Sequence, residues 1–213
     1  LARSGWTYSA DMPRTDSALH RGENDVWVGV IDIQRSALVY GTLIGGSSFD
    51  TSIDMEVTES GDLLVIGRAI SGDFPVVNAM SPFHQGVDQG FIFALKPGES
   101  STTPGHLRFS SSLGGSGSNL NDYATAIVRE PAGTYLCAGY TGAWDYPTTP
   151  GVVQAEYGGG PSDMFLTRLD LRLPSPAFTA TPALGPATLE VRFDAGASTP
   201  AAGYRPSDDE PFM

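Results

Sequence analysis

The sequence is poor in several residue types, and each shortage narrows the choice of function. It contains one cysteine, Cys137, so an intrachain disulfide is excluded. Lys96 is the only lysine, and the formal net charge is -12. A surface that follows nucleic-acid phosphates is therefore not expected. No apolar run reaches the 18 residues that suggest a membrane span.

Residues and motifs of common catalytic sites are scarce as well. The only histidines are His20, His84 and His106, and no HExxH, GxSxG or CxxC pattern occurs. His20 and His84 take matching places where a third copy has Gln154, which favours a turn or packing role. Cys137 aligns with the apolar Val65, so we expect a buried, unreactive thiol. We expect no enzyme active site, no metal site and no cofactor.

What the sequence does contain is a phrase that occurs three times. It opens with glycine and leads to Asp, an apolar residue and Pro, as GWTYSADMP from Gly5, GRAISGDFP from Gly67 and GYTGAWDYP from Gly139. Such recurrence indicates a repeat architecture. After each phrase comes an alternating apolar run, in which Trp27, Phe91 and Phe165 hold the same place. We expect the phrase to mark the seams between repeated structural units.

Short apolar runs with period-two alternation predict antiparallel strands, and no segment predicts a helix of ordinary length. Turns are expected at Gly61 and Gly133. Strands are expected at 26–33, 37–43, 52–57 and 63–67 in a first unit, and at 90–96, 106–112, 124–129 and 134–139 in a second. A strand end before Gly5 and a strand at 163–170 are left over. Four short strands per unit is typical of a β-propeller blade.

Three stretches carry a family resemblance: LVYGTLIGG from Leu38, DFPVVNAMSPFHQGVDQGFIFAL from Asp73, and DYPTTPGVVQAEYGGGPSDMFLTRLDL from Asp145. Over residues 5–171 the chain resembles the β-propeller repeats of bacterial surface proteins, often labelled seven-bladed propeller repeats. The resemblance implies an all-β fold in which residues 1–172 form about two complete blades plus flanking strands. A closed propeller has at least four blades. We therefore expect an open arc or an excised segment, whose sheet edges can pair with another chain.

A second resemblance starts at Pro176. The run PAFTATPALGPATLEVRFDAGAS is similar to the opening of a PKD-like domain, a small immunoglobulin-like sandwich. About forty residues are too few for the roughly seven strands of such a sandwich, so residues 173–213 are expected to be an incomplete domain or a tail. Both resemblances imply an extracellular or cell-surface protein. No signal peptide is visible, and the start at Leu1 fits a processed or excised piece.

Aspartates recur at matching points of the repeats. They stand before proline, after a double glycine and before the next strand, as Asp11, Asp73 and Asp145, as Asp50 and Asp122, and as Asp25, Asp88 and Asp163. Glycosidase carboxylates lie about 5 to 9.5 Å apart, whereas side chains that recur once per repeat are spread out. Aspartate at a turn bonds nearby backbone amides, so a structural role is favoured. The alternative is a propeller enzyme whose carboxylates gather at the axis.

The candidate binding residues lie where the copies differ. Trp144 stands where the preceding copy has Gly72, and Trp6 and Tyr140 share a variable position with Arg68. Loop aromatics stack on sugars or anchor protein partners, although Trp144 could instead cover a neighbouring blade. We expect a non-catalytic secreted or cell-surface module that presents propeller loops for protein or carbohydrate binding. The alternative is the accessory region of a secreted hydrolase whose catalytic domain lies outside this chain.

Overall fold

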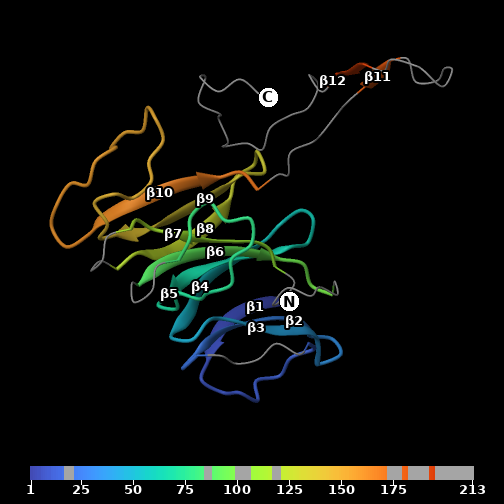
Figure 1. Cartoon of the computed structure of the whole chain (residues 1–213). Coiled ribbons are helices and arrows are strands. Elements are labelled where there is room, and N and C mark those ends of the chain that lie inside the picture. Colours follow the sequence, from blue (N-terminus) through green and yellow to red (C-terminus); the bar gives the residue numbers. More distant parts are fainter. Residues whose placement is uncertain are drawn as a thin grey trace. The chain divides into compact units, whose positions relative to one another are not determined.

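A computed structural model describes residues 1–16, 22–83, 88–98, 107–116, 121–171, 179–181 and 192–194 of the chain (Figure 1). Within these residues the protein is built from β-strands and turns, without a helix. The prediction of an all-β fold is therefore confirmed for the described part of the chain. In this part there is also no helix that is long and apolar enough to cross a membrane.

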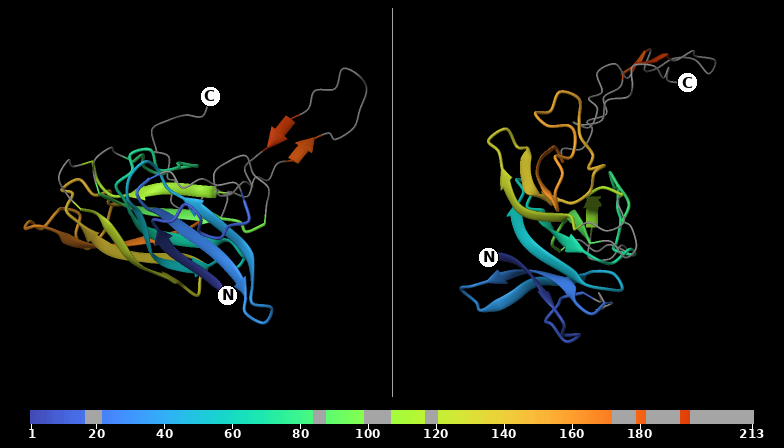
Figure 2. Two further views of the ribbon diagram at one scale, coloured as in Figure 1. Left: turned by 90° about the horizontal axis from the view of Figure 1, so that it is seen from below. Right: turned by 90° about the vertical axis from the view of Figure 1, so that its left-hand side faces the viewer.

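Ten strands form three antiparallel sheets, of order β1-β2-β3, β4-β5-β6-β7 and β10-β9-β8. Strands that follow one another in the chain are also neighbours in each sheet, so every sheet is a meander. The strands are β1 (Ala2–Thr7), β2 (Asp25–Asp32), β3 (Ala37–Ile44), β4 (Asp50–Val57), β5 (Leu63–Ala69), β6 (Gln89–Leu95), β7 (Leu107–Leu113), β8 (Tyr123–Arg129), β9 (Tyr135–Thr141) and β10 (Asp163–Leu169). None of the sheets closes on itself (Figure 2).

The strand positions agree with the sequence, but their grouping does not. Each expected strand is present, with bounds within two residues of the expected ones. The expected units joined β2 and β3 to β4 and β5, whereas β4 to β7 form one sheet. The Gly45-Gly46 turn leads to a new sheet, while the loop with Asp73 returns to the same sheet. The double glycine therefore marks the seam, and the prediction that the Asp-x-Pro phrase does so was wrong.

The three sheets are stacked face to face (Figure 1). The first strand of the middle sheet, β4, contacts β1 of one neighbouring sheet and β8 of the other. The central strands β5 and β6 are covered on both sides, because they contact β8 on one side and share a core cluster with Val26 and Val28 of β2 on the other. Their residues are buried at nearly every position, and the runs LLVIG and FIFAL are apolar throughout. Continuous apolar runs of this kind are what a strand needs when both its faces are buried.

The Asp-x-Pro loops are held on their sheets by aromatic packing. Phe74, from the loop after β5, is 2% exposed and stacks on Phe91 with ring centroids 4.9 Å apart. Phe93 continues this stack at 5.5 Å from Phe91. In the next copy Tyr146 stacks on Phe165 at 4.7 Å. The apolar residue of the phrase therefore packs inward and fixes the position of the aspartate before it.

The hairpin turns that join β4 to β5 and β8 to β9 each contain a glycine, Gly61 and Gly133. Gly61 and Gly133 have φ of +78° and +84°, which confirms the turns expected there.

By contacts the chain divides into two compact units, residues 1–129 with 136–167, and residues 130–135 with 168–213. The PKD-like stretch lies outside the described residues, apart from the short antiparallel pair β11 (Thr179–Thr181) and β12 (Arg192–Asp194).

Candidate functional site

Each turn that leads from one sheet to the next is held by two carboxylates. After β3, Asp50 Oδ2 accepts hydrogen bonds from the Gly46 amide at 2.7 Å and from the Ser71 hydroxyl at 2.8 Å. Asp73 Oδ1 accepts bonds from the Ser47 amide at 2.7 Å and from its hydroxyl at 2.9 Å. The loop that follows β5 is thus fastened to the turn that precedes β4.

The same arrangement follows β7. Asp122 accepts hydrogen bonds from the Gly115 amide at 3.0 Å and from the Thr141 hydroxyl at 2.6 Å. Asp145 accepts bonds from the Ser116 amide at 3.1 Å and also contacts its hydroxyl. Thr141 lies two positions before the residue that matches the serine of the first copy. The repeat therefore preserves the bonds to the carboxylates even where the hydroxyl comes from another position.

The double glycines are required by these carboxylates. A Cβ on Gly46 would stand 2.4 Å from Asp73 Oδ1, and one on Gly115 would stand 2.3 Å from Asp145 Oδ1. Real Cβ atoms essentially never approach another heavy atom so closely. The Cβ atoms of Ser71 and Ala143 would lie equally close, at 2.5 Å from a Cβ on Gly46 and 2.4 Å from one on Gly115. Glycine is needed in these turns because the carboxylates and these Cβ atoms together occupy the space of a side chain.

The two carboxylates nearest the sheets are buried. Asp50 and Asp122 are 0% and 1% exposed, so a substrate does not reach them in this conformation. Burial raises the pKa of Asp50 to about 6, against the lowering effect of its hydrogen bonds, and burial also raises the pKa of Asp122. The geometry supports the structural role expected from the sequence and gives the propeller-enzyme alternative no site at these residues.

One aspartate does not belong to the set in which the sequence alignment placed it. Strand pairing puts Asp25 opposite Thr7, and puts Gln89 opposite Ala69, which matches Thr7. Gln89 therefore replaces Asp25 in the second copy, and its Nε2 donates to Gly115 O at 3.2 Å. The expectation that Asp88 matches Asp25 was wrong by one residue, and Asp88 takes part in a different cluster.

Asp88, Arg68 and Tyr123 form a hydrogen-bonded cluster, here named the Arg68 cluster. Tyr123 Oη donates to Asp88 Oδ2 at 2.8 Å and accepts from Arg68 Nη1 at 2.8 Å. Arg68 Nε lies 3.4 Å from Asp88 Oδ1. Burial, and then the hydrogen bond to Asp88, raises the pKa of Tyr123 to about 12, so its hydroxyl stays protonated near neutral pH. The phenol ring is fixed by two charged groups.

Tyr140 lies directly on this cluster. Its ring stacks on Tyr123 with centroids 4.7 Å apart and an interplanar angle of 26°. Tyr140 is 39% exposed, so much of its surface remains open to solvent. The predicted binding residue Tyr140 is therefore an exposed aromatic on a rigid polar support.

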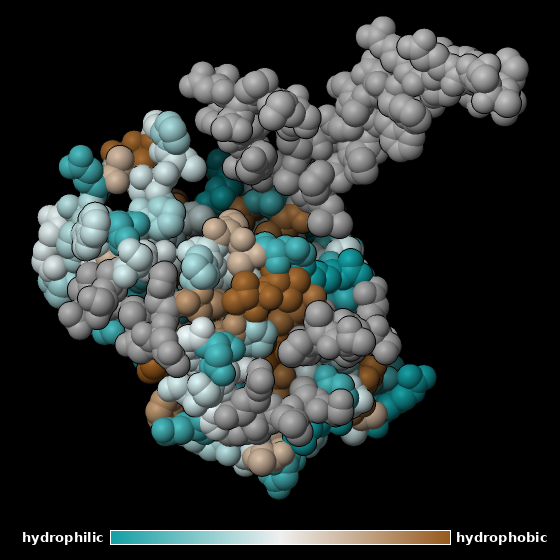
Figure 3. All heavy atoms as spheres, viewed as in Figure 1, coloured by the Kyte–Doolittle hydropathy of each residue, from teal (hydrophilic) through white to brown (hydrophobic). Residues whose placement is uncertain are grey.

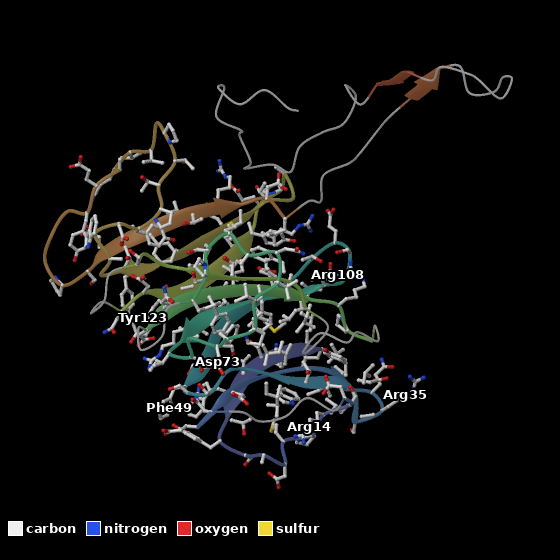
Figure 4. All side chains as sticks on the ribbon, in the orientation of Figure 1. Arg14, Arg35, Phe49, Asp73, Arg108 and Tyr123 are labelled. Carbon is white, nitrogen blue, oxygen red and sulfur yellow. The ribbon has the colours of Figure 1, made fainter. Side chains whose placement is uncertain are left out.

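Trp6 belongs to a second exposed aromatic group. It meets Tyr8 edge to face at 5.3 Å, and Tyr8 meets Phe49 in the same way at 6.4 Å. Trp6 and Tyr8 are 50% and 61% exposed. Figure 4 shows Phe49, Asp73 and Tyr123 along the same side of the stacked sheets, opposite the side of Arg35 and Arg108. Both aromatic groups therefore lie on one side of the stack, here named the aromatic side.

Trp144 is more exposed than either group, with 72% of its surface open. It follows β9 and directly precedes Asp145, whose carboxylate is tied to Ser116. Trp144 therefore covers little of the described sheets. Exposed apolar side chains also occur elsewhere, and one face has a central apolar patch with hydrophilic margins (Figure 3). Exposure alone therefore does not define a site, whereas an organised polar support does.

Of the cysteine and the histidines that the sequence offered as candidate catalytic residues, Cys137 is described in the structure and the three histidines are not. Cys137 is fully buried in β9, as expected, and burial raises the pKa of its thiol to about 12. His20, His84 and His106 lie outside the described residues. Among the residues that the structure does describe, no group of three His, Cys, Asp or Glu side chains could hold a metal ion.

Sequence reasoning found Tyr140 but missed the groups that support it. Arg68, Asp88 and Tyr123 come from β5, the segment before β6 and β8, which are far apart in the chain. The sequence did contain one indication that Arg68 belongs to the site, because Arg68 occupies the same variable repeat position as Trp6 and Tyr140. Only the stacking of two sheets brings Arg68 to Tyr123.

The chain was also compared with known proteins. No protein-family model matches it, and a search of curated proteins finds no match. The functional argument therefore depends on the geometry described above.

Proposed function

We propose that this chain is a non-catalytic binding module of a secreted or cell-surface protein. Its sheets act as blades of an open β-propeller arc, and its ligand binds at Trp6 and Tyr140 on the aromatic side and at Trp144 in the loop after β9. The observation that carries this proposal is the stack of the exposed Tyr140 on Tyr123, whose hydroxyl is held by Arg68 and Asp88.

Preorganisation makes this arrangement suitable for binding. Ordering a flexible side chain at an interface costs about 0.5–1.5 kcal/mol, which a ring already fixed by neighbours largely avoids. The ring of Tyr123 is fixed by two hydrogen bonds, and Tyr140 is fixed by Tyr123. Ligand binding at Tyr140 therefore loses less conformational entropy than binding at a flexible side chain would.

A carbohydrate is the ligand class that suits these groups best. Sugar rings present C–H faces that pack on aromatic rings, and hydroxyls that both donate and accept hydrogen bonds. Tyr140 offers an exposed aromatic surface, and the guanidinium that supports it belongs to Arg68, whose side chain is 32% exposed, whereas that of Asp88 is only 12% exposed. A protein ligand would instead use Trp144 as an anchor, since tryptophan, tyrosine and arginine dominate protein interfaces.

The assignment to a propeller arc draws on two kinds of support. The sheets are sequential meanders stacked face to face, with β4 against β1 and β8. Blades of a propeller are four-stranded sheets, and the middle sheet has four strands while the other two have three each among the described residues. The resemblance to surface-protein repeats and to a PKD-like opening supports a location outside the cell or on its surface.

A glycan screen with three variants tests the proposal. We expect Tyr140→Ala, Trp144→Ala or Trp6→Ala to raise the Kd of a ligand found with the wild-type protein by about tenfold or more, the effect of losing about 1.4 kcal/mol. Val39→Ala is the matched control, because Val39 is 61% exposed but lies in β3, the edge strand of the first sheet opposite β1, which carries Trp6. Ligand binding that none of the three aromatic variants weakens would contradict the proposal.

A further inference from the structure

Three strands carry glycine at the same place, and only one of these glycines is uncrowded. A Cβ on Gly67 in β5 would stand 2.0 Å from Thr51 O of β4, and one on Gly139 in β9 would stand 1.9 Å from Tyr123 O of β8. A Cβ on Gly5 in β1 would meet nothing within 4 Å. Glycine is required in β5 and β9 because a preceding strand passes close by, whereas β1 has the same glycine with that space open.

The burial of β1 differs in the same way. Six of the seven residues of β5 are buried, while no residue of β1 is. Among the described residues β1 is an edge strand, paired on one side with β2. An edge strand presents unpaired backbone groups that can pair with an added strand.

The loop after β1 supplies a third observation. Asp73 and Asp145 each hold the serine of a Gly-Gly-Ser turn that precedes the first strand of their own sheet. Asp11 occupies the matching place after β1, is exposed, and forms no hydrogen bond with any described residue. The partner that its position implies is the serine of a Gly-Gly-Ser turn.

We propose that the open edge of β1, together with Asp11, is a docking site for an extended peptide strand that follows a Gly-Gly-Ser turn. The occupant has the pattern of residues 43–57, LIGGSSFDTSIDMEV, which the chain itself places against β5. This proposal goes beyond ligand binding on the aromatic side and does not depend on it.

The pairing of β4 with β5 gives the register of the docked strand. Ser52 faces Gly67, and Asp50 faces Ala69. The matching residues of the peptide therefore face Gly5 and Thr7. The aspartate of the peptide then lies near Thr7 and Ser9, which match the residues Thr141 and Ser71 that donate hydroxyl groups to Asp122 and Asp50.

A synthetic peptide of residues 43–57, carrying a fluorophore, tests this docking on the whole 213-residue chain. We expect saturable binding in fluorescence anisotropy, no binding of a peptide with scrambled order, and slower hydrogen exchange of β1 amides in the complex. Gly5→Val is expected to raise the Kd by about tenfold or more, because its side chain enters the space of the peptide backbone. Gly5→Val is also expected to leave the thermal unfolding temperature unchanged or raised.

Two matched variants complete the design. Ser4→Val raises strand propensity in β1 without a side chain at Gly5, and we expect it to bind the peptide normally. We expect Asp11→Ala to weaken binding of the wild-type peptide, because it removes the carboxylate that would accept hydrogen bonds from both the amide and the hydroxyl of Ser47. A peptide with Ser47→Ala keeps the amide donor and loses only the hydroxyl, so Asp11→Ala is expected to weaken its binding by a smaller factor. Absence of saturable binding, equal binding by Gly5→Val and wild type, or a dimer that excludes the peptide would overturn the proposal.

Discussion

Asp73 Oδ1 accepts hydrogen bonds from both the backbone amide and the hydroxyl of Ser47, which precedes it by 26 residues. This contact ties the loop that leaves β5 to the turn that enters β4. Asp145 and Ser116 repeat the contact in the next sheet. In the second and third sheets the aspartate of the recurring phrase thus ties the loop inside the sheet to the turn that enters it.

Removing this aspartate tests its structural role. We expect Asp73→Ala and Asp145→Ala each to lower the free energy of unfolding by about 1 kcal/mol, the usual net value of a hydrogen bond. Asp11→Ala is the matched control, since Asp11 stands in the same phrase but forms no hydrogen bond with a described residue. Urea unfolding followed by fluorescence measures all three. Equal stability of Asp73→Ala and Asp11→Ala would contradict the role assigned to Asp73.

The double glycines give a steric test at the same turns. Gly46→Ala places a Cβ 2.4 Å from Asp73 Oδ1 and 2.5 Å from Ser71 Cβ, and Gly115→Ala places one 2.3 Å from Asp145 Oδ1 and 2.4 Å from Ala143 Cβ. We expect each change to destabilise the protein by about 1–3 kcal/mol, as overpacking does. Gly5→Ala, with no atom within 4 Å of the new Cβ, is expected to be neutral or slightly stabilising. Thermal unfolding that fails to separate Gly46→Ala from Gly5→Ala would refute the steric explanation.

Asp50 makes the stability depend on pH. Burial raises its pKa from 3.8 to about 6 in the folded protein, so the folded state binds this proton more tightly than the unfolded state. The stabilising contribution is complete below about pH 4 and is lost as the pH rises through about 6. The difference corresponds to about 3 kcal/mol.

The matched variant is Asp50→Asn, whose carbonyl oxygen still accepts hydrogen bonds but does not titrate. Urea unfolding between pH 4 and pH 7.5 is expected to show a steeper loss of stability for the wild-type protein than for Asp50→Asn. Parallel curves for the two proteins would show that Asp50 titrates as it does in the unfolded chain.

Cys137 provides a test of packing in the third sheet. It is 0% exposed, and burial raises the pKa of its thiol to about 12. We expect the native protein to react with a thiol reagent such as DTNB only through unfolding, while the protein in urea reacts at once with one equivalent. Rapid reaction of the native protein would show that β9 is not packed as described.

The sequence was sufficient to locate the strands and insufficient to pair them. Alternating or continuous apolar runs bounded by turn residues allowed β2 to β10 to be predicted within two residues of their observed bounds. Alternation carries no information about which neighbour a strand bonds, and the first grouping of strands was therefore wrong. The role of Gly46 was hidden for a related reason, because the carboxylate that excludes a side chain there comes from Asp73.

The candidate site, like the fold, could be predicted from the sequence only in part. Comparison of the copies identified Trp6, Tyr140 and Trp144 because these positions vary while the strands around them do not. It missed Asp88 and Tyr123, whose partnership with Arg68 exists only when two sheets are stacked. The alignment of Asp88 was also wrong by one residue. It placed this carboxylate among the turn aspartates, so its contact with Arg68 was not considered.

The three tryptophans allow the most direct test of ligand binding on the aromatic side. Each gives one indole N–H signal in a nitrogen-15 NMR spectrum, and Trp27 serves as an internal control because its Nε1 donates to Pro13 O at 2.7 Å and it is 8% exposed. When a ligand from the glycan screen is titrated in, we expect the signal of Trp6, Trp144 or both to shift saturably while that of Trp27 stays in place. Saturable binding that leaves Trp6 and Trp144 unmoved would contradict the account.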